Sequence, residues 1–264
     1  MRKIRILAFL NFIFFVMACF TANISQLKMF GLPNMADVSR KYDSVFTPAG
    51  ITFAIWGVIY LSLFAFTIYH LLKAFNEEAH SEANHVLLKI GYLFIINNLA
   101  TTLWVFAFLN EWLLLSVVLM LIQLLSLLFI FIKLNLYDVS QSFKNKLFTQ
   151  FPLSIYFAWI CVATIANISA YLVATGWDGF GISDTNWAIA LIFVVLGLSL
   201  FIILIKKNVF FGLVILWAIY GIILKREAVD ANLYHQMIGI CYFVMGLIFG
   251  ASILQLAKNT KGKP

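Results

Sequence analysis

Eight long runs of apolar residues are the feature that most constrains how this chain can fold. They cover approximately residues 6–24, 49–72, 86–109, 112–133, 148–173, 187–205, 208–224 and 234–256. An α-helix rises about 1.5 Å per residue, so roughly 20 residues cross a hydrocarbon core about 30 Å thick. Stretches such as 113–121 are continuously apolar, whereas the strands of a membrane barrel alternate apolar and polar residues. The sequence therefore predicts an all-α, polytopic membrane helix bundle with eight transmembrane helices.

The composition excludes a protein that faces water. Hydrophobic residues make up 63% of the chain and charged residues only 11%, whereas soluble domains carry about 25% charged residues. A secreted domain, a cytosolic enzyme and a disordered regulator are therefore excluded. The net charge of +7 is spread over many loops rather than clustered. We therefore expect membrane lipids as partners, and no nucleic acid.

The distribution of basic residues predicts how the helices are oriented. Of the 18 Lys and Arg residues, 13 lie in the N-terminal segment, the C-terminal segment and alternate loops, and five lie in the remaining loops. Loops rich in Lys and Arg stay in the cytoplasm. We therefore expect an integral protein of the bacterial inner (cell) membrane with cytoplasmic N- and C-termini. A cleaved signal peptide over residues 1–24 is the alternative interpretation of the first run.

Polar residues inside the predicted spans are mostly neutral. No pair of His residues has i, i+4 spacing, and no Ser/His/Asp or Cys/His set is visible, so we predict neither a catalytic residue nor a metal site. Trp56 and Tyr60 share one helix face, and Tyr156, Trp159 and Asn167 share another. Such faces suit a flat apolar ligand, because aromatic walls stack on it and a polar group orients it. A packed core is the alternative interpretation.

The predicted outer loop 25–48 is too apolar to be a free linker. We expect it to fold over the bundle as a lid, because binding residues often lie on such loops. Its large apolar residues are Met29, Phe30, Leu32, Met35, Val38, Tyr42, Val45 and Phe46.

Three motifs lie in the second, third and fifth predicted helices. In chain order their residues are Pro48, Trp56 and Tyr60; Trp104 and Phe108; and Tyr156, Trp159, Ala163 and Asn167. Over about residues 1–175 these motifs resemble the TspO/MBR family of tryptophan-rich sensory proteins, also called the translocator or peripheral benzodiazepine receptor family. The chain departs from the family pattern at Thr101, where the family has Asn, while Asn98 lies one turn earlier.

The resemblance implies a five-helix TspO-like transmembrane domain over residues 1–175 and a three-helix C-terminal transmembrane extension over 176–264. It also implies a pocket for a flat apolar ligand, either a tetrapyrrole (a porphyrin or haem precursor) or a sterol-like lipid, in transport, sensing or regulation. No cofactor is required. The implied ligand-binding residues are Pro48, Phe53, Trp56, Tyr60, Asn98, Thr101, Trp104, Phe108, Tyr156, Trp159, Ala163 and Asn167.

Two other functions stay open at this point. One is a small-solute membrane carrier, although the lack of charges inside the membrane argues against proton coupling. The other is an enzyme that degrades a membrane-soluble porphyrin, although no acid–base set is visible. Glycines in the last three spans allow close helix packing, either within one chain or in a homodimer. These glycines are Gly212, Gly221, Gly239, Gly246 and Gly250.

Overall fold

A computed structural model describes residues 1–26, 33–136 and 141–261, and within these ranges the chain forms helices and connecting segments but no strand. In chain order the elements are α1 (Arg2–Gln26), α2 (Met35–Lys41), η1 (Gly50–Ala54), α3 (Ile55–Asn76), α4 (Glu82–Ile90), α5 (Leu93–Leu109), α6 (Leu113–Leu134), α7 (Phe143–Asn145), η2 (Lys146–Gln150), α8 (Phe151–Ala174), η3 (Gly179–Gly181), α9 (Asp184–Leu200), η4 (Phe201–Ile205), α10 (Val209–Asp230) and α11 (His235–Lys261).

The number of membrane-spanning helices agrees with the sequence. Among the described residues, seven helices are long and apolar enough to cross a membrane, and the bent pair α4–α5 makes an eighth. The prediction of an all-α polytopic membrane bundle is confirmed.

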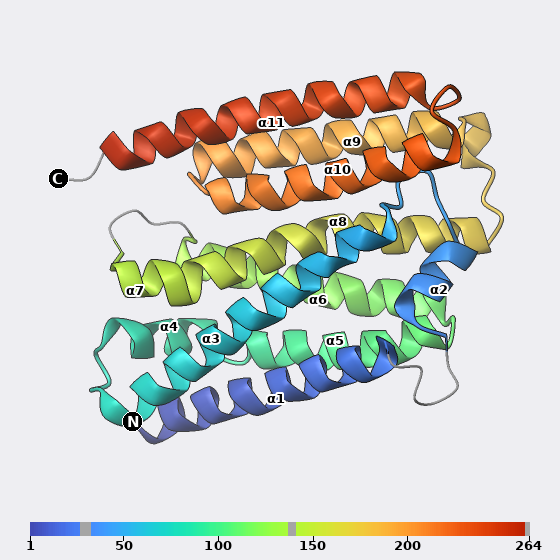
Figure 1. Cartoon of the computed structure of the whole chain (residues 1–264). Helices are drawn as coiled ribbons and strands as arrows, with labels where there is room; N and C mark the ends of the chain where they lie inside the picture. Colours follow the sequence, from blue (N-terminus) through green and yellow to red (C-terminus); the bar gives the residue numbers. More distant parts are fainter. Residues whose placement is uncertain (27–32, 137–140, 262–264) are drawn as a thin grey trace.

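The third predicted span differs from the expected continuous helix. The chain bends by 57° between α4 and α5. The break falls at Gly91, which adopts a φ of +57°, a conformation that glycine reaches without steric cost. As a result α5 has 17 residues, while α4 folds back at an angle near the start of the span (Figure 1).

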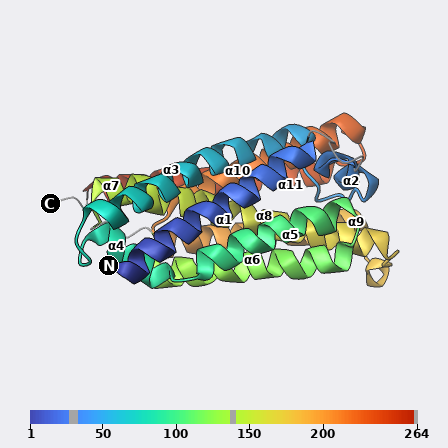
Figure 2. The same cartoon turned by 90° about the horizontal axis from the view of Figure 1, so that it is seen from below.

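The helices pack in layers along one common direction (Figure 1). Helices α9, α10 and α11 lie on one side, α1 and α5 lie on the other, and α6 and α8 lie between them, while α3 runs obliquely across α8 from the α1 side toward α10. Figure 2 shows α5 and α6 running side by side, and these two helices are in extensive contact. The start of α1 and the end of α11 lie at one end of the bundle, and α2 lies at the opposite end. We call these the terminal end and the α2 end.

The start of the second span docks closely on α10. The amide of Ala49 donates to the carbonyl of Gly221 (2.9 Å), and the indole N–H of Trp217 donates to the carbonyl of Thr52 (2.9 Å). Gly221 faces Thr52 so closely that an added Cβ would overlap Thr52 Oγ1 and lie 2.8 Å from its Cγ2. The segments on either side of the predicted domain boundary at residue 175 are therefore in direct contact. That boundary itself stays a prediction.

Gly221→Ala is expected to destabilise the protein by about 2 kcal/mol, because an extra methyl group in a packed contact forces neighbouring atoms apart. Thermal unfolding in detergent measures the loss. Gly239→Ala is the matched control, because a Cβ there meets no atom within 4 Å. Adding Thr52→Ala to Gly221→Ala removes the overlapping Oγ1 and Cγ2 and should restore about half of the lost stability. Equal stability of Gly221→Ala and Gly239→Ala would contradict the close contact.

Candidate functional site

A small cavity lies at the α2 end, enclosed by α2, residues 47–53, α3, α5, α6 and α8. Its volume is about 60 Å³, which is room for only a few water molecules. Its lining is apolar and aromatic except for three polar side chains. The lining residues are Met35, Ser39, Thr47, Pro48, Phe53, Trp56, Trp104, Phe108, Met120, Trp159, Val162, Ala163, Ala166, Asn167 and Ala170.

Aromatic rings from α3 and α8 form one wall of the cavity. The Trp56 ring stacks on Tyr60 with centroids 5.2 Å apart and meets Trp159 edge to face at 6.1 Å. Phe53 also meets the Trp159 ring edge to face, with centroids 6.0 Å apart. These contacts hold the rings of Trp56 and Trp159 in fixed, nearly perpendicular orientations beside the cavity.

The opposite wall is held by hydrogen bonds between helices. The indole N–H of Trp104 donates to Asn167 Oδ1 (2.7 Å), and Asn167 Nδ2 donates to Ser116 Oγ (2.8 Å). The Trp104 ring also stacks on Phe108, with centroids 5.2 Å apart. The side-chain amide of Asn167, expected from the resemblance to orient a ligand, thus already joins α5, α6 and α8.

Trp159 is the exception in this set of satisfied polar groups. Its side chain is only 2% exposed, and its indole nitrogen has no hydrogen-bond partner among the described residues. Buried donors are almost always paired, because an unpaired donor loses its bonds to water without replacement. A buried, unpaired N–H in the wall of a cavity is suited to donate to a ligand.

The structure separates the twelve predicted ligand-binding residues into three groups. Eight line the cavity: Pro48, Phe53, Trp56, Trp104, Phe108, Trp159, Ala163 and Asn167. Tyr60 lines an adjoining cavity together with Trp56 and Trp104. The remaining three, Asn98, Thr101 and Tyr156, line neither cavity.

Thr101 and Tyr156 instead belong to a buried hydrogen-bond network between α5, α6 and α8. The Tyr156 hydroxyl donates to Asn97 Oδ1 (2.8 Å) and lies 3.1 Å from Thr101 Oγ1. Thr101 Oγ1 also lies 2.9 Å from Gln123 Oε1, and Asn97 Nδ2 donates to the Gln123 carbonyl (3.1 Å). Asn98 donates to the Phe94 carbonyl of its own helix (2.7 Å). These groups satisfy one another and leave no free group toward the cavity.

Sequence reasoning missed seven lining residues. Ala166 and Ala170 lie one and two turns beyond Ala163 on the same helix face, so helical spacing was a usable signal for them. The others carry no such signal, because their place depends on how separate elements pack. They are Met35, Ser39, Thr47, Met120 and Val162.

The segment 33–48 covers the cavity, as expected for part of the predicted lid. Lys41 Nζ and the Tyr42 hydroxyl both donate to Glu111 Oε2, at 2.5 and 2.6 Å. On the other side, Asp43 forms ion pairs with Lys225 and Arg226 of α10. The segment is thus tied at two points of the α2 end. Three residues of the predicted lid, Met29, Phe30 and Leu32, lie outside the described residues.

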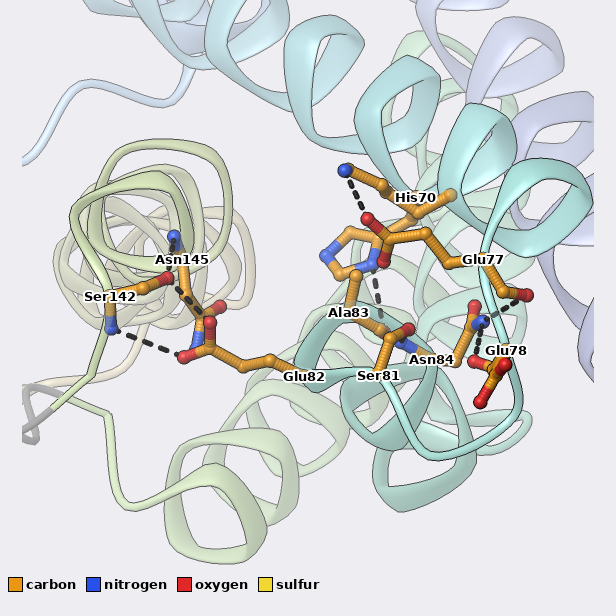
Figure 3. Close-up of polar contacts among 10 residues, drawn as sticks. His70, Glu77, Glu78, Ser81, Glu82, Ala83, Asn84, Ser142 and Asn145 are labelled. Atoms are coloured by element: carbon orange, nitrogen blue, oxygen red, sulfur yellow. Dashed lines mark hydrogen bonds and ion pairs between the residues drawn. The ribbon is translucent and has the colours of Figure 1, made fainter.

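A polar cluster joins three elements at the terminal end (Figure 3). His70 on α3 lies 3.2 Å from the Ala83 carbonyl and 2.9 Å from Thr149 Oγ1, through its Nδ1 and Nε2 atoms. The Glu82 carboxylate accepts from the Ser142 amide (3.2 Å) and from Asn145 Nδ2 (3.1 Å). The cluster holds the bent α4 against α3 and against the α7–η2 segment that leads into α8, far from the cavity.

No metal site accompanies these features within residues 1–26, 33–136 and 141–261, where no three His, Cys, Asp or Glu side chains lie close enough to hold an ion. The spans and the enclosed aromatic cavity define an integral membrane protein with an interior, predominantly apolar site. A family model described as TSPO-like protein matches residues 8–254. The chain belongs to this family, as the three motifs predict. The match continues past residue 175 through α9 and α10 and most of α11. No curated protein and no solved structure matches the chain.

Tyr156→Phe is expected to lower the stability by about 1 kcal/mol, because it leaves Asn97 Oδ1 without its donor between membrane helices. Thermal unfolding measures this loss. Since Tyr156 does not line the cavity, affinity for a cavity ligand should change by less than about twofold. A large loss of affinity with unchanged stability would instead place Tyr156 in the site.

The Glu111 contacts predict a pH dependence of the lid. The Lys41 ammonium, and then the Tyr42 hydroxyl, lower the pKa of the Glu111 carboxyl from its usual 4.5. A lowered folded pKa gives stability that is complete above about pH 4.5 and is lost as the pH falls through the lowered value. Amide exchange in α2, corrected for intrinsic rates, should therefore be faster in Glu111→Gln than in the parent at pH 7. The difference should shrink as the pH falls below 4.5 and vanish once Glu111 is protonated in the folded protein, and a difference that does not shrink would contradict this role for Glu111.

Proposed function

We propose that the protein binds a flat apolar ligand with a hydrogen-bond acceptor, of the tetrapyrrole or sterol-like lipid class, in the cavity beneath α2. Membership of the TSPO-like family and the composition of the cavity wall support this proposal. The observation that carries it is the buried, unpaired N–H of Trp159. Binding serves transport, sensing or regulation in the membrane, rather than chemistry by residues of the site.

The shape of the wall favours a flat ligand. The rings of Trp56 and Trp104 lie on different helices and both face the cavity, so a planar molecule can contact aromatic faces or edges on two sides. A hydrogen-bond acceptor at the edge of the planar molecule can accept from the Trp159 N–H. This bond offsets the free energy lost by burying that donor without a partner. A purely aliphatic ligand gains nothing from Trp159.

The ligand must widen the cavity to enter. About 60 Å³ is well below the roughly 300–1,000 Å³ of pockets that hold small molecules. The α2 part of the covering segment is attached through the largely exposed ion pair of Lys41 with Glu111, and exposed ion pairs contribute little stability. On α8 the wall consists of small residues, Ala163, Ala166 and Ala170. Displacement of α2 is therefore the route by which the cavity opens.

Trp159→Phe tests the proposal, because it keeps an aromatic ring in the wall while it removes the N–H together with part of the indole ring. Protoporphyrin added to the purified protein should bind about tenfold more weakly to this variant, which corresponds to one buried hydrogen bond. The absorbance of the porphyrin measures binding without relying on Trp fluorescence. Trp112→Phe is the matched control, since Trp112 is 60% exposed and lies outside the cavity. Equal affinity of both variants and the parent, or no binding by any of them, rules the proposal out.

A further inference from the structure

A second, larger cavity lies on the other side of α8. Its volume is about 390 Å³, which falls in the range of small-molecule sites. Its α8 residues, such as Ile168 and Leu172, differ from those that line the first cavity. Residues 44–46 and the first turns of α9 border it. The lining residues are Ser44, Val45, Phe46, Ile165, Ile168, Ser169, Leu172, Val173, Trp177, Asp184, Trp187, Ala188 and Leu191.

An aromatic cluster lies at the mouth of this cavity. Trp177 packs against Trp187 and against Phe180, with ring centroids 5.3 and 5.4 Å apart. The Trp187 N–H donates to the Gly179 carbonyl (2.9 Å), which fixes the ring. Phe180 is 80% exposed and has a φ of +56°. This conformation is strained for a bulky residue, and such strain concentrates at binding sites.

The charge at the mouth is negative. The loop 176–186 contains Asp178 and Asp184 but no Lys or Arg. The Asp178 carboxylate accepts from the Phe180 amide (3.0 Å). Asp184 lines the cavity and forms no ion pair with any residue that the structure describes. Lys225 and Arg226 of α10, which contact the covering segment, are already engaged by Asp43.

We propose that this second cavity binds a single-chain amphiphile with an ammonium head group. The alkyl chain lies between α8 and α9 against Ile165, Ile168 and Leu191, where burial of apolar surface stabilises it. The ammonium group lies at the mouth beside the Asp184 carboxylate and the indole rings. A cation over an aromatic face gains up to about 2 kcal/mol when it is desolvated. The carboxylate provides the opposite charge, so neutral and anionic amphiphiles of equal length bind more weakly.

The test compares dodecylamine, dodecanol and dodecanoate on the full chain in phosphatidylglycerol nanodiscs. Native mass spectrometry of the released protein counts bound molecules at each concentration. We expect one saturable dodecylamine per chain, bound on the order of tenfold more tightly than dodecanol, and little dodecanoate. Asp184→Asn should remove that tenfold preference. Because Asp184 is exposed, this variant should fold like the parent.

Two further variants test the position of the chain. Ser169→Leu fills the cavity from α8 and should abolish binding of all three amphiphiles. Ala190→Leu adds the same bulk to an exposed position of α9 outside the cavity and should leave binding unchanged. Protoporphyrin binding should be the same in Asp184→Asn and the parent. Failure of the amphiphile proposal for the second cavity is therefore distinguishable from failure of the proposed function of the first.

Several results would overturn this inference. One is equal binding of dodecylamine and dodecanol, and another is a change of less than twofold in the preference for dodecylamine in Asp184→Asn.

Bilayer lipids with ammonium head groups are the other source of the same chemistry. Replacing a neutral glycolipid by phosphatidylethanolamine, at constant phosphatidylglycerol content, should leave dodecylamine affinity unchanged. A tenfold loss would assign the cavity to a two-chain phospholipid instead.

Discussion

In a hydrocarbon environment, apolar side chains gain little by facing one another rather than lipid, so polar contacts and close packing determine how membrane helices associate. The central helix α8 supplies several of these contacts here. Its Tyr156 and Asn167 connect it to α5 and α6, and its Ser154 accepts from Asn208, just before α10 (2.7 Å). These bonds fix how α5, α6 and the start of α10 lie against α8.

The first cavity lies where this set of contacts ends. Along one face of α8, Tyr156 and Asn167 find partners, whereas Trp159 between them does not. The small side chains that follow on this face, Ala163, Ala166 and Ala170, cannot fill the space below α2. An unsatisfied donor and unfilled volume therefore occur together, and both are costs to stability that a bound molecule removes.

The sequence predicts the spans well because hydrophobic length is a property of each segment alone. It does not predict the break at Gly91, because glycine is common in continuous membrane helices and only the packing of α4 requires a bend there. The same distinction applies to the cavity. Helical spacing places Trp56 and Trp159 on inward faces, yet it cannot tell that Thr101 and Tyr156 bond to each other, since that depends on the rotation of neighbouring helices. For the same reason the segment containing Met35 could be expected to cover the bundle, but its contacts could not.

The docking of residues 49–52 on α10 has a consequence for the order in which the protein assembles. The bond between Trp217 and Thr52 joins residues 165 positions apart. A ribosome adds about 5–20 residues per second, so Thr52 is synthesised roughly 10–30 s before its partner exists. During this interval the beginning of the second span lacks the surface against which it finally packs. The last helices thus complete the part of the bundle that is made first, and final closure of the α2 end waits for the chain to be almost finished.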